Sequence, residues 1–128
     1  MPDAIVLDAS AILAILKREP GADRVKEVLD RAAICAVNVA EVQSKLVDGG
    51  LSRQAAEARI RFLGCSILPF GEEQAFEAGS LIAQTRSFGL SLGDRACLAL
   101  AIDRKATVYT TDKIWKSLNL GIKIEVIR

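Results

Sequence analysis

The chain has 128 residues, of which 17 are Lys or Arg, 16 are Asp or Glu, three are Cys and none is His. Histidine is the usual general base near neutral pH and the commonest metal ligand, so its absence excludes a Ser-His-Asp or Cys-His nucleophilic site, RNA cleavage driven by histidine, and an ordinary zinc centre built on histidine. The formal net charge of +1 provides no general attraction for nucleic acid, so any such attraction has to be local.

The length suits one compact domain, and no repeat, low-complexity tract or linker rich in proline and glycine divides it, so we expect a single domain over residues 1–128. A hydrophobic fraction of 51% with 26% charged residues is typical of a globular protein in water. The longest apolar run, residues 11–16, is too short to span a bilayer, and we expect neither a signal peptide nor a membrane contact. The three cysteines form no CxxC pair and are expected to be buried thiols, which favours a cytoplasmic location.

In the first half of the chain, hydrophobic periodicity and turn residues predict two strands and four helices. The short continuous run Ala4 to Leu7 is typical of a strand buried on both faces. Pro20-Gly21 ends the first helix, and Ser52 is placed to cap the last one. In chain order the predicted elements are a strand at 4–7, helices at 10–19 and 22–31, a strand at 33–37, and helices at 39–47 and 52–63.

In the second half, strands and helices alternate again. Pro69 indicates that the strand carrying it ends there or lies at an edge of the sheet. The predicted elements are a strand at 65–70, helices at 72–88 and 92–105, a strand at 107–110, a short helix after Asp112, and a strand at 122–127. This alternation predicts an α/β fold: a three-layer α/β/α sandwich with a central, mainly parallel sheet of about five strands.

Four acidic residues stand near the predicted strand ends or helix starts. Asp8 and Asp112 directly follow strands, Glu41 lies four residues past the second strand, and Asp94 opens the helix at 92–105. Each has a structural explanation when taken singly. Asp8 and Asp112 are good helix N-caps, and the segments 38–41 and 91–94 resemble capping boxes.

The position of Asp94 on its helix indicates a role beyond capping the helix N-terminus. Its neighbours at i+3, i+4 and i+7 are all apolar, so the carboxylate heads a stripe that faces the core, where a charge is costly unless a cation or several donors satisfy it. Glu41 is less informative, because Asn38, Lys45 and Asp48 share its helix face and a solvated salt bridge to Lys45 explains it almost as well.

Together, the four acids predict a metal site. In a parallel sheet Asp8 and Asp112 leave strand ends at the same edge, where the helices bearing Glu41 and Asp94 also begin. Four like charges that converge there either take up protons or bind cations. Hard oxygen ligands without histidine or paired thiols indicate Mg²⁺ or Mn²⁺, and four carboxylates match the charge of two divalent ions, although one ion remains an alternative.

Four short segments carry these acids in a fixed order: Val6-Leu7-Asp8-Ala9-Ser10-Ala11, Asn38-Val39-Ala40-Glu41-Val42, Leu92-Gly93-Asp94-Arg95-Ala96 and Val108-Tyr109-Thr110-Thr111-Asp112. In order, spacing and chain length they resemble the motifs of PIN-domain nucleases, and most of all the VapC toxin group of bacterial and archaeal toxin–antitoxin pairs. The resemblance covers the whole chain. It implies a ribonuclease that uses Mg²⁺ or Mn²⁺ to cut single-stranded or structured RNA.

The resemblance carries over Asp8, Glu41, Asp94 and Asp112 as the catalytic, metal-binding quartet. It places Thr110 near the metal waters, and Ser10 either has a similar supporting role or satisfies local backbone groups. In the expected hydrolysis, one ion held chiefly by Asp8 and Asp94 activates a water, and Glu41 or Asp112 orients that water or completes a second metal site.

RNA has to approach an acidic centre, so a cationic rim is expected around it. The candidates are Arg95, Lys113 and Lys116, with a weaker case for Lys17 and Lys45. Trp115 is the one aromatic residue near the predicted site, and it either stacks on a base or anchors the last helix in the core.

The toxin resemblance further implies a homodimer and a small VapB-like antitoxin that occupies a groove lined by the early helices. The apolar run at 11–16 exceeds what one buried helix face needs, which agrees with such a groove but also with a helix packed on two sides. A stand-alone RNA-processing nuclease and a non-catalytic PIN-like interaction module remain alternatives. A phosphatase-like domain of the haloacid-dehalogenase type is disfavoured, because Ser10 stands where a second acid is needed, and no P-loop motif is present.

Overall fold

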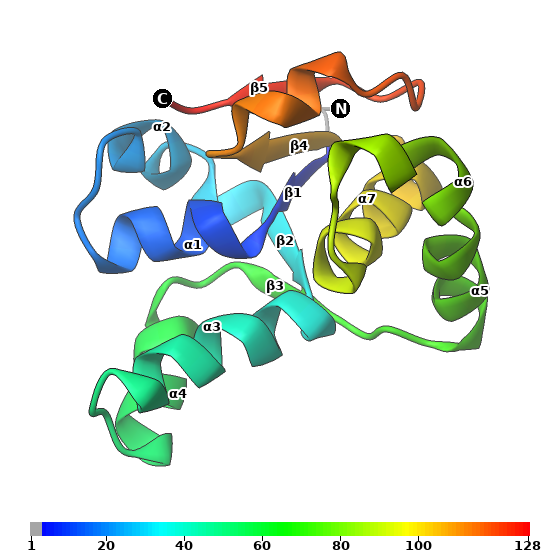
Figure 1. Ribbon diagram of the computed structural model, residues 1–128. Coiled ribbons are helices and arrows are strands. Elements are labelled where there is room, and N and C mark those ends of the chain that lie inside the picture. The colour runs from blue at the N-terminus through cyan, green and yellow to red at the C-terminus, as the bar shows by residue number, and fades with distance from the viewer. Residues whose placement is uncertain (1–3) are drawn as a thin grey trace.

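The computed structural model describes residues 4–128, which form a five-stranded sheet flanked by helices (Figure 1). The strands are β1 (Ile5–Leu7), β2 (Ala32–Cys35), β3 (Ser66–Leu68), β4 (Thr107–Thr110) and β5 (Ile124–Val126). Their order across the sheet is β3-β2-β1-β4-β5, and every pair is parallel. The prediction of an α/β fold with a parallel sheet is therefore confirmed, and the carboxyl ends of all five strands meet at one edge.

Helices cover both faces of the sheet and make it the middle of three layers. Alternate residues of β1 explain this, because Ile5 and Leu7 pack into one apolar cluster and Val6 into the other. The first cluster lies under α1 (Ala9–Leu16), α2 (Ala22–Lys26), α3 (Ala36–Asp48) and α4 (Arg53–Phe62). The second lies under α5 (Glu72–Ser80) and α7 (Leu92–Arg104), which Figure 1 shows, together with α6 (Ile82–Thr85), across the sheet from α1 and α2.

The predicted elements occur in the predicted order, with several boundaries moved. The helix expected at 10–19 ends at Leu16, and the one expected at 22–31 stops at Lys26 and is followed by a 3₁₀ turn at Leu29–Arg31. The segment 72–88 is divided into α5, α6 and a 3₁₀ turn at Arg86–Phe88 that ends at Gly89 in the left-handed conformation. Both 3₁₀ turns lie just after an α-helix, where such turns are frequent.

The start of α3 is the boundary that matters for the site. Asn38 was expected to precede this helix, yet α3 begins at Ala36, directly after β2, and no side chain caps it. Asn38 therefore lies inside the first turn of α3, where it is buried. The prediction of a capping box at 38–41 is wrong.

In the part of the chain that the structure describes, no helix combines the length and the apolar character needed to cross a bilayer. All three cysteines are free thiols, with Cys35 and Cys97 buried and Cys65 half-buried. Pro69 follows β3, which is an edge strand as the proline indicated.

Candidate active site

Asp8 is a buried carboxylate at the carboxyl end of β1. Its Oδ1 accepts hydrogen bonds from the Ala11 backbone N–H (2.8 Å) and the Ser10 hydroxyl (2.6 Å), so it caps α1 as predicted. Its Oδ2 accepts from the hydroxyl of Thr110 at the end of the neighbouring strand β4 (2.5 Å). With 4% of its surface exposed, Asp8 is fixed in place by its own helix and by the adjacent strand.

The environment of Asp8 disfavours its charged form. Burial raises the pKa of this carboxyl from 3.8 to about 6, and the negative charge of Asp94 adds to the rise. The hydrogen bonds from Ser10, Thr110 and Ala11 oppose this change without cancelling it. A buried carboxylate with a raised pKa beside a second carboxylate is a group that a cation would stabilise.

Two hydroxyl groups join the ends of β1 and β4. The Ser10 hydroxyl oxygen accepts from the Thr111 N–H (2.9 Å), and the Thr110 hydroxyl oxygen accepts from the Asp112 N–H (3.1 Å). Asp112 in turn accepts from the Ile114 N–H (3.0 Å) and caps the 3₁₀ turn Lys113–Ser117. Ser10 and Thr110 therefore hold Asp8 and Asp112 in a fixed relation.

Asp94 forms the capping box that the sequence predicts. Its N–H donates to the Ser91 hydroxyl (3.1 Å), and the Ser91 N–H donates to its Oδ2 (2.9 Å). Below it the expected apolar stripe is confirmed, because Cys97, Leu98 and Ala101 are fully buried. The carboxylate of Asp94 thus lies at the N-terminus of the central helix of its layer, where the helix dipole favours a negative charge.

Glu41 is held by a different kind of contact. The side-chain amide of Asn38, one turn earlier on α3, donates to Glu41 Oε1 (2.7 Å) and also to the backbone carbonyl of Gly93 on α7 (3.0 Å). The Glu41–Lys45 salt bridge that the spacing allowed is not formed among residues 4–128. The Glu41 carboxylate lies so close to Gly93 that a Cβ on that glycine would be 2.5 Å from both of its oxygens.

Three of the four acids share a cleft of about 360 Å³ at the carboxyl edge of the sheet. Asp8, Asp94 and Asp112 line it, and Glu41 borders this region through its contact with Gly93, the residue before Asp94. The remaining lining residues come from α1, α3 and the segment after β4: Ala9, Ser10, Leu13, Lys45, Thr111 and Trp115. The structure therefore brings the predicted acids to one edge, although they come from four separate segments.

The donor set fits Mg²⁺ or Mn²⁺, because carboxylate and hydroxyl oxygens are the ligands these ions prefer. Among the described residues no three acidic, cysteine or histidine side chains are close enough to hold an ion together. This arrangement is compatible with magnesium, which usually keeps several waters and binds one or two carboxylates together with substrate phosphates. Asp8 and Asp94 are the first candidates to hold it, since the charge of Asp94 already acts on Asp8.

The basic residues predicted to form a cationic rim differ in where the structure places them. Lys113 and Lys116 are exposed on the 3₁₀ turn that Asp112 caps. Arg95 instead donates to the Ala78 carbonyl of α5 (3.1 Å) and does not line the cleft. Lys45, which the sequence indicated less strongly as a residue of this rim, lines the cleft beside Asp8 and Asp94.

Trp115 forms part of the cleft wall, but as a core residue. It is 1% exposed and packs in the apolar cluster under α7. Of the two roles open to it from the sequence, the structure favours anchoring the segment after β4 over stacking on a base.

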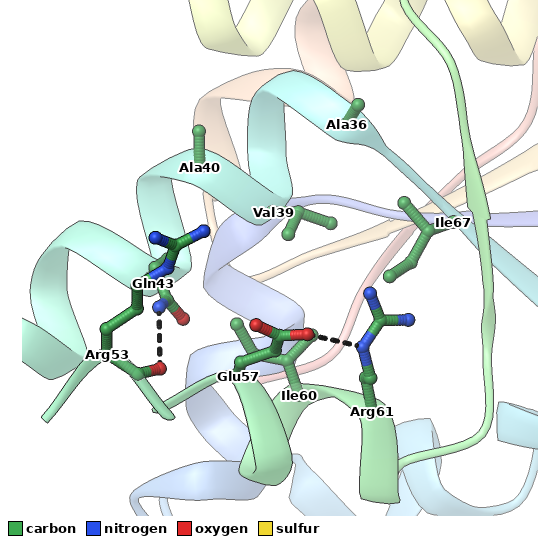
Figure 2. A pocket seen from close by; sticks show the side chains of 9 residues that line it. All are labelled: Ala36, Val39, Ala40, Gln43, Arg53, Glu57, Ile60, Arg61 and Ile67. Carbon is green, nitrogen blue, oxygen red and sulfur yellow. Dashed lines mark hydrogen bonds and ion pairs between the residues drawn. The ribbon is translucent and has the colours of Figure 1, made fainter. Parts of the chain in front are cut away.

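A second hollow, of about 420 Å³, lies between α3, α4 and β3 (Figure 2). Figure 2 shows that its carboxylate, Glu57, is paired with Arg61 (2.8 Å) and that Gln43 donates to the Arg53 carbonyl (3.1 Å). Because Glu57 is already paired with Arg61 and none of the four predicted acids lines this hollow, it is a weaker candidate for a metal site.

Sequence reasoning did not single out Asn38 or Gly93 as parts of the site. One signal was available for Gly93, because a glycine inside a helix is destabilising and usually has a packing reason. The Asn38 contact gave no local signal, since its partner carbonyl lies 55 positions away.

A family model described as the PIN domain matches residues 5–119, so the chain belongs to the PIN domain family. Its fold is shared with chains of toxin–antitoxin complexes. These include VapBC2 of Rickettsia felis bound to a DNA fragment from its promoter (18% identity, 95% of this chain and 97% of that chain, TM-score 0.74) and a toxin–antitoxin complex of Klebsiella pneumoniae (16%, 98% and 98%, 0.74). VapBC-5 of Mycobacterium tuberculosis is similar at 24% identity, over 99% of both chains, with a TM-score of 0.66. A comparison with curated protein sequences finds no significant match.

Proposed function

We propose that this PIN domain, spanning residues 1–128, is an endoribonuclease that depends on Mg²⁺ or Mn²⁺ and hydrolyses RNA phosphodiester bonds. The observation that carries the proposal is the buried Asp8 carboxyl, with its pKa raised to about 6, in a cleft that it shares with Asp94 and Asp112. Family membership supports it, because PIN domains are typically metal-dependent nucleases.

The residues have distinct roles in this proposal. Asp8 and Asp94 are the principal metal ligands, and Glu41 and Asp112 complete the acidic set. When bound, such an ion lowers the pKa of a water that it holds and neutralises charge on the scissile phosphate. Ser10 and Thr110 orient Asp8 through their hydrogen bonds, and the ammonium groups of Lys45, Lys113 and Lys116 attract the RNA backbone.

The proposal is tested by Asp94→Asn. Asparagine keeps an oxygen that accepts from the Ser91 N–H, so the capping box and the fold should survive. RNA cleavage with Mn²⁺ should fall more than about 100-fold, because mutation of residues that merely support metal ligands already lowers metal affinity or activity about 10- to 100-fold. Cleavage of a labelled RNA and thermal unfolding are measured together. Asp103→Asn, an exposed acid on the same helix, is the matched control and should keep full activity.

Full activity in Asp94→Asn, or undiminished cleavage in the presence of a chelator, contradicts the metal-nuclease proposal. Such a result favours a non-catalytic PIN-like module whose acids act only as helix caps.

We further propose that the protein is the toxin of a type II VapBC-type pair, acts in the cytoplasm as a homodimer, and binds a small VapB-like antitoxin. The structural neighbours from toxin–antitoxin complexes support this role. A groove of about 650 Å³ between α1, α2 and α4 supports it as well. Its lining includes apolar side chains, among them Phe62, which is 91% exposed, and the positively charged Arg18, Lys26 and Arg59. An amphipathic segment with apolar and acidic side chains is complementary to such a groove.

Expression in bacteria tests the toxin role. Induction should arrest growth, a small acidic partner expressed with the protein should purify with it, and Phe62→Ser should weaken that association while leaving RNA cleavage unchanged. Induction without any effect on growth, together with no small partner, favours a stand-alone RNA-processing nuclease.

A further inference from the structure

Asn38 is a buried amide in the first turn of α3, with 1% of its surface exposed. Both of its hydrogen bonds, to Glu41 Oε1 (2.7 Å) and to the Gly93 carbonyl (3.0 Å), leave from the amide nitrogen. The orientation of the amide follows from its partners, because both are acceptors and a flipped group would turn its oxygen toward them. The amide nitrogen is thus committed to one carboxylate and one carbonyl.

These two bonds connect Glu41 to the helix turn that carries Asp94. Gly93 lies in the first turn of α7, one residue before Asp94, so the amide of Asn38 spans from α3 to α7. On the other side, the Glu41 carboxylate occupies the space that a Cβ on Gly93 would need. The Asn38 amide therefore holds the Glu41 carboxylate by a hydrogen bond, and the absence of a side chain at Gly93 leaves the room that this carboxylate needs.

A purely structural role explains the choice of asparagine poorly. The Oδ1 of Asn38 is buried and has no hydrogen-bond partner among residues 4–128. An unpaired buried acceptor costs free energy, whereas an apolar residue of similar size could pack α3 against α7 without that cost. An apolar residue cannot supply the two hydrogen bonds of this amide, and of these the bond to Glu41 is the one that reaches a proposed metal ligand.

We propose that Asn38 is a positioning residue, which holds the Glu41 carboxylate beside Asp94 and so prepares it for a divalent cation. The inference rests on the proposed function, since Glu41 is one of the proposed metal ligands. Asn38 acts through Glu41 and touches neither the RNA nor the ion.

A double-mutant cycle with Mn²⁺ as the probe separates positioning from packing. Asn38→Ala should weaken Mn²⁺ binding about 10- to 100-fold, measured from the electron paramagnetic resonance signal of free Mn²⁺. In a Glu41→Gln background the same change should have no further effect, because the group that Asn38 positions is no longer a carboxylate. An equal loss in both backgrounds, or no loss in either, overturns the inference.

The wild-type protein offers a second measurement that does not depend on whether the variants fold. Asn38 and the exposed Asn119 are the only asparagines in the sequence, so labelling with ¹⁵N-asparagine gives two side-chain amide groups in an NMR spectrum. Addition of Mg²⁺ should shift the Asn38 amide and leave the Asn119 amide unchanged.

The outcomes of this titration distinguish the two proposals. If Mg²⁺ and Mn²⁺ perturb no signal of the wild-type protein, the proposed metal-dependent function fails and the inference fails with it. If the ions bind and support RNA cleavage, but the Asn38 amide does not move, only the positioning role is overturned.

Discussion

The four acids at the carboxyl edge of the sheet are held in two different ways. Asp8, Asp94 and Asp112 each accept a hydrogen bond from a backbone N–H within three residues, as helix caps do. Glu41 accepts no such bond from any backbone N–H of residues 4–128. It is fixed by the Asn38 side chain and by the empty space at Gly93.

This difference determines how easily a substitution elsewhere in the chain displaces each acid. A capped acid keeps its place as long as its own helix begins where it does, so its position depends on local sequence. The position of Glu41 depends on the packing of α3 against α7, and a small change on either helix displaces it. A substitution on either helix can therefore displace Glu41, whereas Asp8 depends on a distant segment only through the Thr110 hydroxyl.

The substitution Gly93→Ala tests this dependence of Glu41 on helix packing directly. In Gly93→Ala the new methyl group would lie 2.5 Å from both Glu41 oxygens, so the carboxylate has to move and RNA cleavage with Mn²⁺ should fall about 10- to 100-fold. Gly79→Ala in α5 is the matched control, since its Cβ meets nothing within 4 Å. The control should keep its activity and gain about 0.5–1 kcal/mol of stability in urea unfolding. Wild-type activity in Gly93→Ala would remove the distinction between Glu41 and the other acids.

A second prediction concerns the free energy that the burial of Asp8 costs. The folded protein binds the Asp8 proton more tightly than the unfolded chain, because burial raises the pKa of Asp8 from 3.8 to about 6. The stability that this proton contributes is fully present below about pH 4 and is lost as the pH rises to about 6, a change of roughly 3 kcal/mol.

Urea unfolding between pH 4 and pH 7 in the presence of a chelator measures this loss. Other acids titrate in the same range, so the informative quantity is the difference between the wild-type protein and Asp8→Asn, in which the contribution of Asp8 should vanish. Saturating Mg²⁺ should restore stability to the wild-type protein at pH 7. Parallel pH profiles for the two proteins would show that Asp8 is not strained by its burial.

The sequence predicts those parts of the site that depend on neighbours along the chain. The caps at Asp8, Asp112, Ser52 and Ser91 follow from residue type and from the start of an apolar run, and all four are observed. The convergence of the acids at one edge also follows from sequence, because parallel strands place their carboxyl ends together.

Features that depend on contacts between distant segments were missed. The segment 38–41 has the residues of a capping box, but β2 runs directly into α3, and Asn38 becomes a link to α7. Arg95 is adjacent to Asp94 in sequence, yet its side chain turns to the Ala78 carbonyl. Lys45 reaches the cleft because α3 packs beside α1, which its spacing alone did not reveal.

The strand order also determines when this site can exist during synthesis. β1 lies between β2 and β4, and one of the two hydroxyl groups that hold Asp8 comes from Thr110, 102 residues further along the chain. A nascent chain that has not yet released β4 from the ribosome carries Asp8, Glu41 and even Asp94, but its first strand lacks a partner on one side. Contacts of such long sequence separation slow folding, because closing the loop between them costs entropy. The acidic cleft is therefore completed only after β4 has left the ribosome, which delays any activity until β1 and β4 can pair.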